Sequence, residues 1–283
     1  MTANPTYRYP RLLTIAGSDS CGAAGIQADL KTFAALGCYG MTAITAVTAQ
    51  NTRGVTAIHA VPPDILRAQI VAVLDDIGVD AIKIGMLPTP EAVQVVAEIL
   101  THYGPQKLKH VVLDPVMVAT SGDRLMTAQT VQVMVLTLFP LVSVLTPNLD
   151  EATVLLGRAV TGLDDLETAA HDLLGLGAPA VLLKGGHLQG PTVMDVLVTA
   201  SGTRVQLPAP RIASLNLRGT GCTLSSAIAA HLALGHSLPQ AVALARTYLL
   251  QTIATGRDVT TGNGHGPLNH SHAPQAMLKL VAH

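Results

Sequence analysis

Short apolar segments alternate with amphipathic segments of helical period along almost the whole chain. The segments expected to form strands are residues 12–16, 41–47, 81–84, 111–113, 142–145 and 180–183. Helical patterns are expected over residues 25–36, 63–75, 90–102, 126–138 and 163–176. Strands separated by helices pair in parallel, and the helices then cover both faces of the sheet. The alternation therefore predicts an α/β fold with a mostly parallel central sheet.

Two regions depart from this alternation. Residues 54–61 predict an edge strand beside residues 41–47. Residues 193–199 and 203–207 predict a β-hairpin that turns at Ala200-Ser201-Gly202, because small and glycine residues favour tight turns.

Beyond this hairpin, helices are expected over residues 222–234 and 239–254, with a last short helix near the C-terminus. The sequence contains no low-complexity linker and no fixed-period repeat. We therefore expect residues 1–283 to form a single domain, with residues 1–10 as a flexible N-terminal extension.

The composition limits the classes of partner. Apolar residues make up 49% of the chain and aromatic residues 2%, which predicts an aliphatic core. The net charge of −1 gives no reason to expect a nucleic acid or an anionic membrane as partner. The most apolar stretch, residues 131–145, is interrupted by Gln132 and Pro140, so no membrane span is expected. The N-terminus resembles no secretory signal, and the cysteines have no metal-like spacing, so free thiols in a cytoplasmic protein are expected.

A glycine-rich turn, Gly219-Thr220-Gly221-Cys222, leads directly into an amphipathic segment. Backbone N–H groups at a helix start, together with the helix dipole, attract anions, and glycines let a phosphate approach closely. The turn is therefore a candidate phosphate site, although an ordinary helix start explains it equally well. It is not a P-loop, because no Gly-Lys-Ser/Thr follows.

Cys222 is expected in the first turn of that helix. A thiol at a helix start can have a lowered pKa and act as a base or nucleophile. The alternative is a small buried residue that packs the turn.

Three further loops follow predicted strands, at the sheet edge where ligands bind in such folds. The loop of residues 14–25 is rich in small residues, which suits a close ligand or a tight turn. Asn148 and Glu151 are spaced to share one face of a helix start, where they could hold hydrated Mg²⁺ or simply cap the helix. Lys184 ends an apolar strand and is a candidate phosphate ligand.

Seven motifs and a C-terminal segment carry a resemblance to one family. They are AGSDSCGAAGIQADLKTF (16–33), TAQNT (48–52), KIGML (83–87), VVLDPVM (111–117), TPNLDEA (146–152), VLLKGGH (181–187), GTGCTLSSAIAA (219–230) and GHGPLNHSHA (264–273). In this order they resemble the hydroxymethylpyrimidine/phosphomethylpyrimidine kinases of thiamine biosynthesis, within the ribokinase superfamily. The resemblance covers essentially the whole chain.

The resemblance implies a ribokinase-like three-layer α/β/α sandwich, often a homodimer. It also implies that ATP phosphorylates the hydroxymethyl group of 4-amino-5-hydroxymethyl-2-methylpyrimidine, and then phosphorylates the monophosphate to the diphosphate. Gln50 would pair with the edge of the pyrimidine, because its amide offers both a donor and an acceptor. Gly17, Asp29 and Met86 would line the same pocket.

The remaining roles implied by the resemblance concern phosphates. Asp114 and Glu151 would organise Mg²⁺, with Asn148 beside them, and Lys184 would reach the phosphates of the nucleotide. The turn of Gly219, Thr220 and Gly221 would form the anion hole, with Cys222 where other ribokinase-like enzymes have a catalytic Asp.

The sequence departs from the family pattern at Asn216-Leu217-Arg218, where Asn-Thr-His is usual, and at Cys21 and Ala24, where glycines are common. Arg218 would add a permanent charge beside the transferred phosphate and would bind the nucleotide together with Lys184, Asn148 and Glu151. Two alternative functions are a pyridoxal kinase, alone or as a dual activity, and a catalytically weak sensor of pyrimidines or nucleotides. The histidines of the tail, His265, His270 and His272, lack an accompanying carboxylate or cysteine, so no metal is expected there.

Overall fold

The structure, a computed structural model, describes residues 6–117 and 125–281. Its main sheet has nine strands in the order β10-β9-β8-β7-β6-β5-β2-β3-β4. The parallel strands are β2 (Arg11–Asp19), β3 (Tyr39–Gln50), β5 (Ala81–Ile84), β6 (Val111–Leu113), β7 (Val144–Leu145) and β8 (Ala180–Leu183). The antiparallel strands at the two edges are β4 (Val55–Ala60), β9 (Thr192–Thr199) and β10 (Arg204–Pro210). This confirms the predicted mostly parallel sheet, the edge strand and the hairpin.

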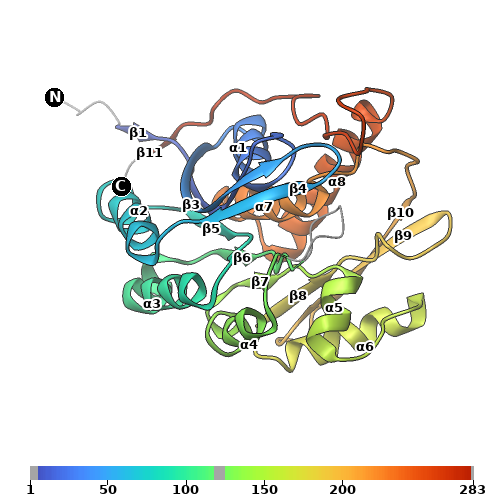
Figure 1. The fold of residues 1–283 in the computed structure, drawn as a ribbon, viewed down its shortest axis with the longest axis horizontal. Coiled ribbons are helices and arrows are strands. Elements are labelled where there is room, and N and C mark those ends of the chain that lie inside the picture. Colours follow the sequence, from blue (N-terminus) through green and yellow to red (C-terminus); the bar gives the residue numbers. More distant parts are fainter. Residues whose placement is uncertain (1–5, 118–124, 282–283) are drawn as a thin grey trace.

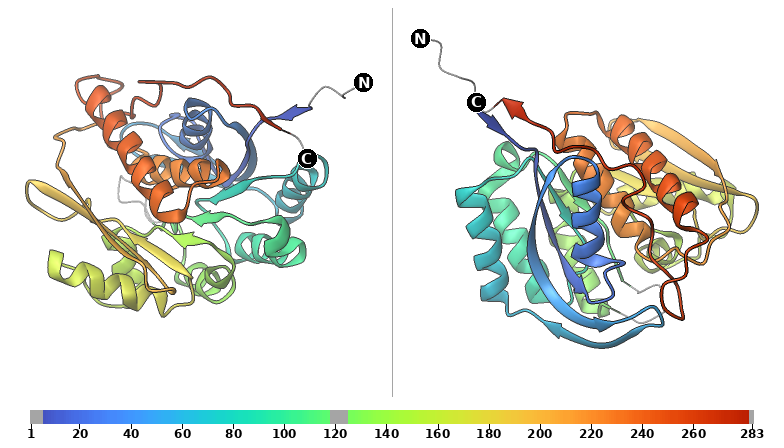
Figure 2. Two further views of the ribbon diagram at one scale, coloured as in Figure 1. Left: turned by 180° about the vertical axis from the view of Figure 1, so that it is seen from behind. Right: turned by 90° about the horizontal axis from the view of Figure 1, so that it is seen from above.

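Helices cover both faces of the sheet (Figures 1 and 2). One face carries α2 (Pro63–Asp76), α3 (Pro90–Lys107), α4 (Ala128–Thr137), α5 (Leu149–Leu156) and α6 (Leu163–Leu174). The other carries α1 (Gly25–Ala35), α7 (Thr220–Ala233) and α8 (Leu238–Gly256). The architecture is therefore the predicted α/β/α sandwich.

Local chemistry explains where several helices begin and end. The Thr89 hydroxyl accepts a hydrogen bond from the Ala92 N–H at 3.2 Å, which caps α3. α3 then runs past the predicted end at residue 102 to Lys107, through a kink at Gly104. α7 begins two residues before the predicted start, because Gly219 takes a left-handed conformation with φ of 84° and caps it.

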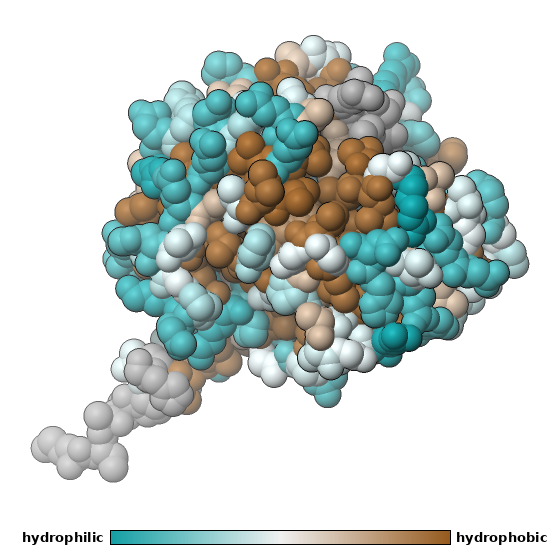
Figure 3. Space-filling view, turned by 90° about the horizontal axis from the view of Figure 1, so that it is seen from below, coloured by the Kyte–Doolittle hydropathy of each residue, from teal (hydrophilic) through white to brown (hydrophobic). Residues whose placement is uncertain are grey.

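The core consists of two aliphatic layers, one on each face of the sheet. Side chains alternate along the strands, so Leu13 and Ile15 point into one layer and Leu12 into the other. Because both faces are covered, the central strands β5 to β8 are buried throughout, as expected for parallel strands. Figure 3 shows one outer face of the molecule, where apolar residues gather in the middle and polar residues surround them.

The order in which strands are added to the sheet reverses beside β2. From β2 the chain first adds β3 on one side and then crosses to add β5, β6, β7 and β8 in turn on the other. In parallel α/β sheets, ligands bind outside the carboxyl ends of the strands at such a switch point. All the parallel strands end at this edge, so the loops that follow them meet there.

The two ends of the chain differ from the sequence prediction. No helix forms in the described residues after α8, so the prediction of a short final helix was wrong. Instead the tail crosses the surface and its last strand, β11 (Leu280–Val281), pairs antiparallel with β1 (Tyr7–Arg8) (Figure 1). Arg8 Nη1 also contacts Asp80 Oδ2 at 2.6 Å. Tyr7 and Arg8, which belong to the N-terminal extension predicted to be flexible, are therefore anchored to the rest of the chain. Residues 1–5 of that extension lie outside the described residues.

Candidate active site

The loop after β2 is organised around the Asp19 carboxylate. Its Oδ1 accepts a hydrogen bond from the Cys21 N–H at 2.9 Å, and its Oδ2 accepts from the N–H groups of Ala23 and Ala24 at 3.1 and 2.9 Å. Asp19 is buried, so these bonds replace the water that the carboxylate loses. The carboxylate therefore holds the small-residue loop in a tight turn.

The start of α7 packs directly against this loop. A β-carbon at Gly219 would lie only 1.9 Å from the Ala23 carbonyl oxygen, and its φ of +84° also excludes other residues. Only glycine therefore allows the phosphate turn and the loop after β2 to meet. The contact places the first N–H groups of α7, which lack partners within the helix, at the switch point.

Charged side chains gather on the other side of the α7 start. Lys184 Nζ, at the end of β8, lies 2.8 Å from Asp114 Oδ1 and 3.9 Å from Glu151 Oε2. A β-carbon at Gly221 would lie 3.2 Å from Asp114 Oδ2 and 3.3 Å from Lys184 Nζ. The structure thus brings together the predicted cation, both predicted metal ligands and the predicted anion hole.

Burial sets the ionisation of this cluster. Loss of water raises the pKa of Glu151 to about 7, an effect that Lys184 opposes and Asp114 adds to. Burial acts to lower the pKa of Lys184, but the Asp114 and Glu151 carboxylates outweigh it and raise that pKa. Lys184 is therefore a permanent cation, whereas the charge of Glu151 depends on what binds beside it.

Asn148 and Glu151 form a capping box at the start of α5. Asn148 Oδ1 accepts from the Glu151 N–H at 2.9 Å, and Glu151 Oε2 accepts from the Asn148 N–H at 2.7 Å. The alternative that Asn148 and Glu151 cap the helix is therefore confirmed. The capping box also fixes the Glu151 carboxylate toward Lys184, so capping and ligand binding are compatible.

Three of the residues predicted to form the pyrimidine pocket, Gly17, Gln50 and Met86, lie at the carboxyl ends of β2, β3 and β5. A β-carbon at Gly17 would lie 2.6 Å from Met86 Cε, so these two residues meet as predicted. Gln50, at the end of β3, is half-buried, and its side-chain oxygen accepts from the Thr48 hydroxyl at 3.0 Å. Its backbone N–H donates to Ser20 Oγ at 2.9 Å, which ties Gln50 to the loop after β2.

Asp29 does not line this pocket. Its side chain is 0% exposed, and both carboxylate oxygens lie 2.9 Å from Lys83 Nζ, which is also 0% exposed. The Thr14 and Ser226 hydroxyls donate to the same carboxylate at 2.6 and 2.7 Å. The prediction for Asp29 therefore needs correction, because this buried network, not the substrate, supplies all of its partners here.

Sequence reasoning assigned no role to Lys83, the cation of that network. It could have been found from the signal that identified Lys184, a single lysine in an otherwise apolar strand. Ser226 is one turn along α7 from Cys222. Through Ser226, the network links the start of α7 to β2, β5 and α1.

The predicted lowering of the Cys222 pKa was wrong. Burial raises the pKa of this thiol to about 11, although the nearby Lys83 ammonium acts in the opposite direction. Loss of water disfavours a thiolate more than the helix start favours it. The thiol is therefore protonated at neutral pH in this structure.

Arg218, which was also predicted to bind the nucleotide, lies beside Asp19 on the β2-loop side of the α7 start, whereas Lys184 lies beside Asp114 and Glu151. The Arg218 side chain is 2% exposed, and its Nε lies 3.7 Å from Asp19 Oδ2. The prediction of a charge beside the phosphate turn is consistent with this position.

The donor set suits a small oxygen-preferring cation. Mg²⁺ is usually held by one or two carboxylates together with phosphates and water, and Asp114 and Glu151 supply two converging carboxylates. Within the described ranges, no group of three or more histidine, cysteine or acidic side chains could hold a metal by itself. Of the tail histidines, His270 is buried, and its Nε2 lies 2.9 Å from the Thr223 hydroxyl.

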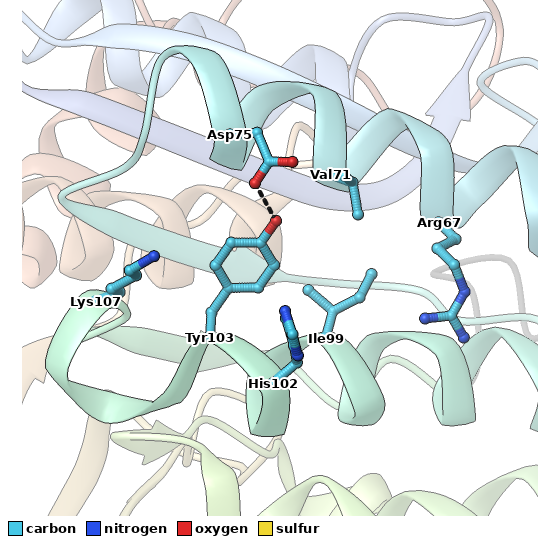
Figure 4. A pocket seen from close by; sticks show the side chains of 7 residues that line it. All are labelled: Arg67, Val71, Asp75, Ile99, His102, Tyr103 and Lys107. Carbon is cyan, nitrogen blue, oxygen red and sulfur yellow. Dashed lines mark hydrogen bonds between the residues drawn. The ribbon is translucent and has the colours of Figure 1, made fainter.

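A surface hollow of about 480 Å³ lies between α2 and α3, away from these residues (Figure 4). Tyr103 points across it to Asp75, and none of the predicted site residues lines it. In the described part of the chain, no helix is long and apolar enough to cross a membrane.

A mostly parallel α/β sandwich that gathers a glycine-rich helix start, a partly buried lysine and two carboxylates at the carboxyl ends of its strands defines a ribokinase-like phosphotransferase. Residues 19–269 match the phosphomethylpyrimidine kinase family. The hydroxymethylpyrimidine/phosphomethylpyrimidine kinase of Rhizobium meliloti is 50% identical over 92% of this chain and 96% of its own length, and that of Escherichia coli is 45% identical over 92% and 97%. The chain belongs to the phosphomethylpyrimidine kinase family, as its motifs predicted.

Solved structures of related enzymes have the same fold. A phosphomethylpyrimidine kinase from Clostridium difficile is 42% identical, with a TM-score of 0.75 over 86% of this chain and 99% of that one. An ADP complex of Bacillus subtilis pyridoxal kinase is 37% identical, with a TM-score of 0.83 over 93% and 98%. The predicted ribokinase-like fold and enzyme class are confirmed.

Proposed function

We propose that this enzyme uses ATP and Mg²⁺ to phosphorylate 4-amino-5-hydroxymethyl-2-methylpyrimidine and then its monophosphate, in thiamine biosynthesis. The observation that carries the proposal is the convergence of Lys184, Asp114 and Glu151 on the start of α7. Phosphoryl transfer requires mainly positioning and neutralisation of charge, and this cluster provides both. Family membership supports the choice of substrate.

Each part of the site has a role in the proposal. Lys184 and the N–H groups of Gly219, Thr220 and Gly221 hold the phosphates of the nucleotide, with Asn148 at the adjoining helix start. Asp114 and Glu151 hold Mg²⁺, which neutralises phosphate charge when it is bound. Gln50, with Gly17 and Met86 beside it, holds the pyrimidine ring.

Pyridoxal kinase activity is the second candidate. Its support is the high structural similarity to the Bacillus subtilis pyridoxal kinase. ADP release should be measured with the pyrimidine alcohol, with pyridoxal and with neither. The proposal expects ADP release mainly with the pyrimidine, whereas release mainly with pyridoxal, or with neither, would overturn it.

A variant at Gln50 tests the pyrimidine pocket. Gln50→Ala removes the amide that faces the aminopyrimidine edge, so kcat/KM for the pyrimidine should fall by the equivalent of roughly 1–3 kcal/mol. The KM for ATP should change little. Gln69→Ala is a suitable control, because this amide pairs with the Ile44 backbone instead. An unchanged kcat/KM in Gln50→Ala would remove Gln50 from the site.

We also propose that the enzyme is a homodimer. The edge strand β4 is exposed over most of its length, and it carries Ile58, which is 41% exposed. A second copy that covers this edge would bury this apolar side chain and pair the free edge of the strand. Light scattering of the wild type and of an Ile58→Glu variant tests this, with a monomer expected for the variant.

A further inference from the structure

The Arg218 guanidinium is buried without the partners that such a group needs. Within the described chain, neither Nε nor Nη2 has a hydrogen-bond partner. The nearest carboxylate, Asp19, is 3.7 Å from Nε and already accepts three backbone N–H groups. A buried cation with unused donors costs free energy, and proteins normally pair every such group. The interactions of the fold therefore do not account for this side chain.

The backbone fixes the position of this guanidinium. The Arg218 N–H donates to the Gly266 carbonyl at 3.3 Å, and the next residue, Gly219, is packed against Ala23. Arg218 therefore stays between the loop after β2 and the start of α7, a helix of 14 residues. A buried guanidinium with free donors, only distantly paired with Asp19, and a helix start together form an anion site.

The anion site faces the acceptor rather than the nucleotide. Lys184 and Asp114 contact the start of α7 at Gly221. Arg218 instead neighbours Asp19, and the same loop carries Ser20, which hydrogen-bonds the backbone of Gln50 in the pyrimidine pocket. The two cations thus lie on the two sides of the helix start, one toward each reactant.

The two proposed phosphorylations differ in the proton they release and in the charge of the acceptor. The first forms a P–O bond to the hydroxymethyl oxygen, breaks the bond between the γ-phosphorus and ADP, and releases the hydroxyl proton. The second forms a P–O–P bond from a dianionic phosphate oxygen, breaks the same bond of ATP and releases no proton. The second step therefore needs no base, but it must bring two anions together, and a cation on the acceptor side reduces that repulsion.

We infer that Arg218 binds the phosphate of the phosphomonoester acceptor and favours the second phosphorylation. This rests on the proposed function. The guanidinium is 2% exposed beside Asp19, and Ser20, the next residue along the chain, is exposed, so phosphate entry requires this part of the loop to shift. The phosphate oxygens then accept from the donors of Arg218 that have no partner in the described residues.

Kinetics of both steps test this inference. In Arg218→Gln, the ratio of kcat/KM for the monophosphate to that for the alcohol should fall about 10- to 100-fold, and Arg218→Lys should restore part of it. Arg257→Gln, a change at an exposed arginine, is the matched control and should leave the ratio unchanged. An unchanged ratio in Arg218→Gln overturns the inference, and so does a raised KM for ATP with equal loss in both steps, which would assign Arg218 to the nucleotide.

Thermal unfolding gives a readout independent of activity. Each Tm is first measured without ligand, because Arg218→Met removes a buried charge but also the Asp19 ion pair at 3.7 Å. The pyrimidine monophosphate alone should raise the Tm of the wild type more than that of Arg218→Met, whereas the alcohol should raise both equally. Equal shifts with the monophosphate overturn the inference. If the wild type phosphorylates neither compound, the proposed function itself fails.

Discussion

Lys83 and Asp29 form an ion pair in the interior beneath α7, with Lys83 Nζ 2.9 Å from both carboxylate oxygens and neither side chain exposed. Burial alone would lower the pKa of Lys83, but Asp29, Cys222 and Asp114 together outweigh it and raise that pKa. The pair connects β5 to α1, and Ser226 links it to α7. It therefore supports the helix start on which the proposed chemistry depends.

Breaking this ion pair should destabilise the protein strongly. Lys83→Met leaves a buried carboxylate without its cation, so the free energy of unfolding should fall by about 3–5 kcal/mol. Asp29→Asn should have a similar effect. The double variant should lose much less than the sum, because it leaves no unpaired charge. Urea unfolding measures all three, and losses that add within about 0.5 kcal/mol would show that the two residues act independently.

The metal and phosphate roles can be separated by a rescue experiment. Glu151→Gln retains an acceptor for the capping box but loses charge at the metal, so a raised Mg²⁺ concentration should restore part of its activity. Lys184→Ala should lower kcat by about 10²–10³ and gain nothing from Mg²⁺. Asp150→Asn is the control, because its carboxylate is exposed and pairs with His187. Equal rescue of both variants, or of neither, would contradict this division of roles.

Cys222→Ala should lower kcat of the first phosphorylation by about 10²–10⁴, if the thiolate takes the hydroxyl proton. Burial raises the pKa of the thiol to about 11, so the thiolate fraction, and with it the rate, should rise about tenfold per pH unit from pH 7 toward 10. The variant should lose this pH dependence. A folded Cys222→Ala enzyme with near-normal kcat would show that Cys222 only packs the turn.

The tail should make stability depend on pH. Burial lowers the pKa of His270 to about 4, and Lys31 contributes, whereas an unfolded histidine titrates near 6.5. Between these values the unfolded chain binds more protons, so the free energy of unfolding should decrease as pH falls below about 6.5. The loss should reach roughly 2–3 kcal/mol near pH 4.

Urea unfolding at pH 7.5 and pH 5 measures this dependence. Burial also lowers the pKa of His231 to about 4, so His270→Asn should flatten the dependence only in part. Asn retains a partner for the Thr223 hydroxyl. An identical pH dependence in the variant and the wild type would show that His270 is not responsible.

The sequence alone determined the order of the main-sheet strands and of most helices along the chain, because the hydrophobic period and the turn residues are local properties, but it did not predict the pairing of β1 with β11. The strands over residues 81–84, 111–113 and 180–183 have the predicted bounds. The same local patterns, read as family motifs, identified the enzyme class and placed Lys184 and Cys222 at the phosphate turn.

Only the tertiary structure decided what each side chain meets. It buried Asp29 against Lys83, which lies 54 residues away in the chain, and it buried Arg218 beside Asp19. It also reversed the expected shift of the Cys222 pKa, since loss of water depends on all the neighbours of the thiol and not on the helix start alone. Burial and long-range pairing are properties of the packed molecule, and a local pattern does not contain them.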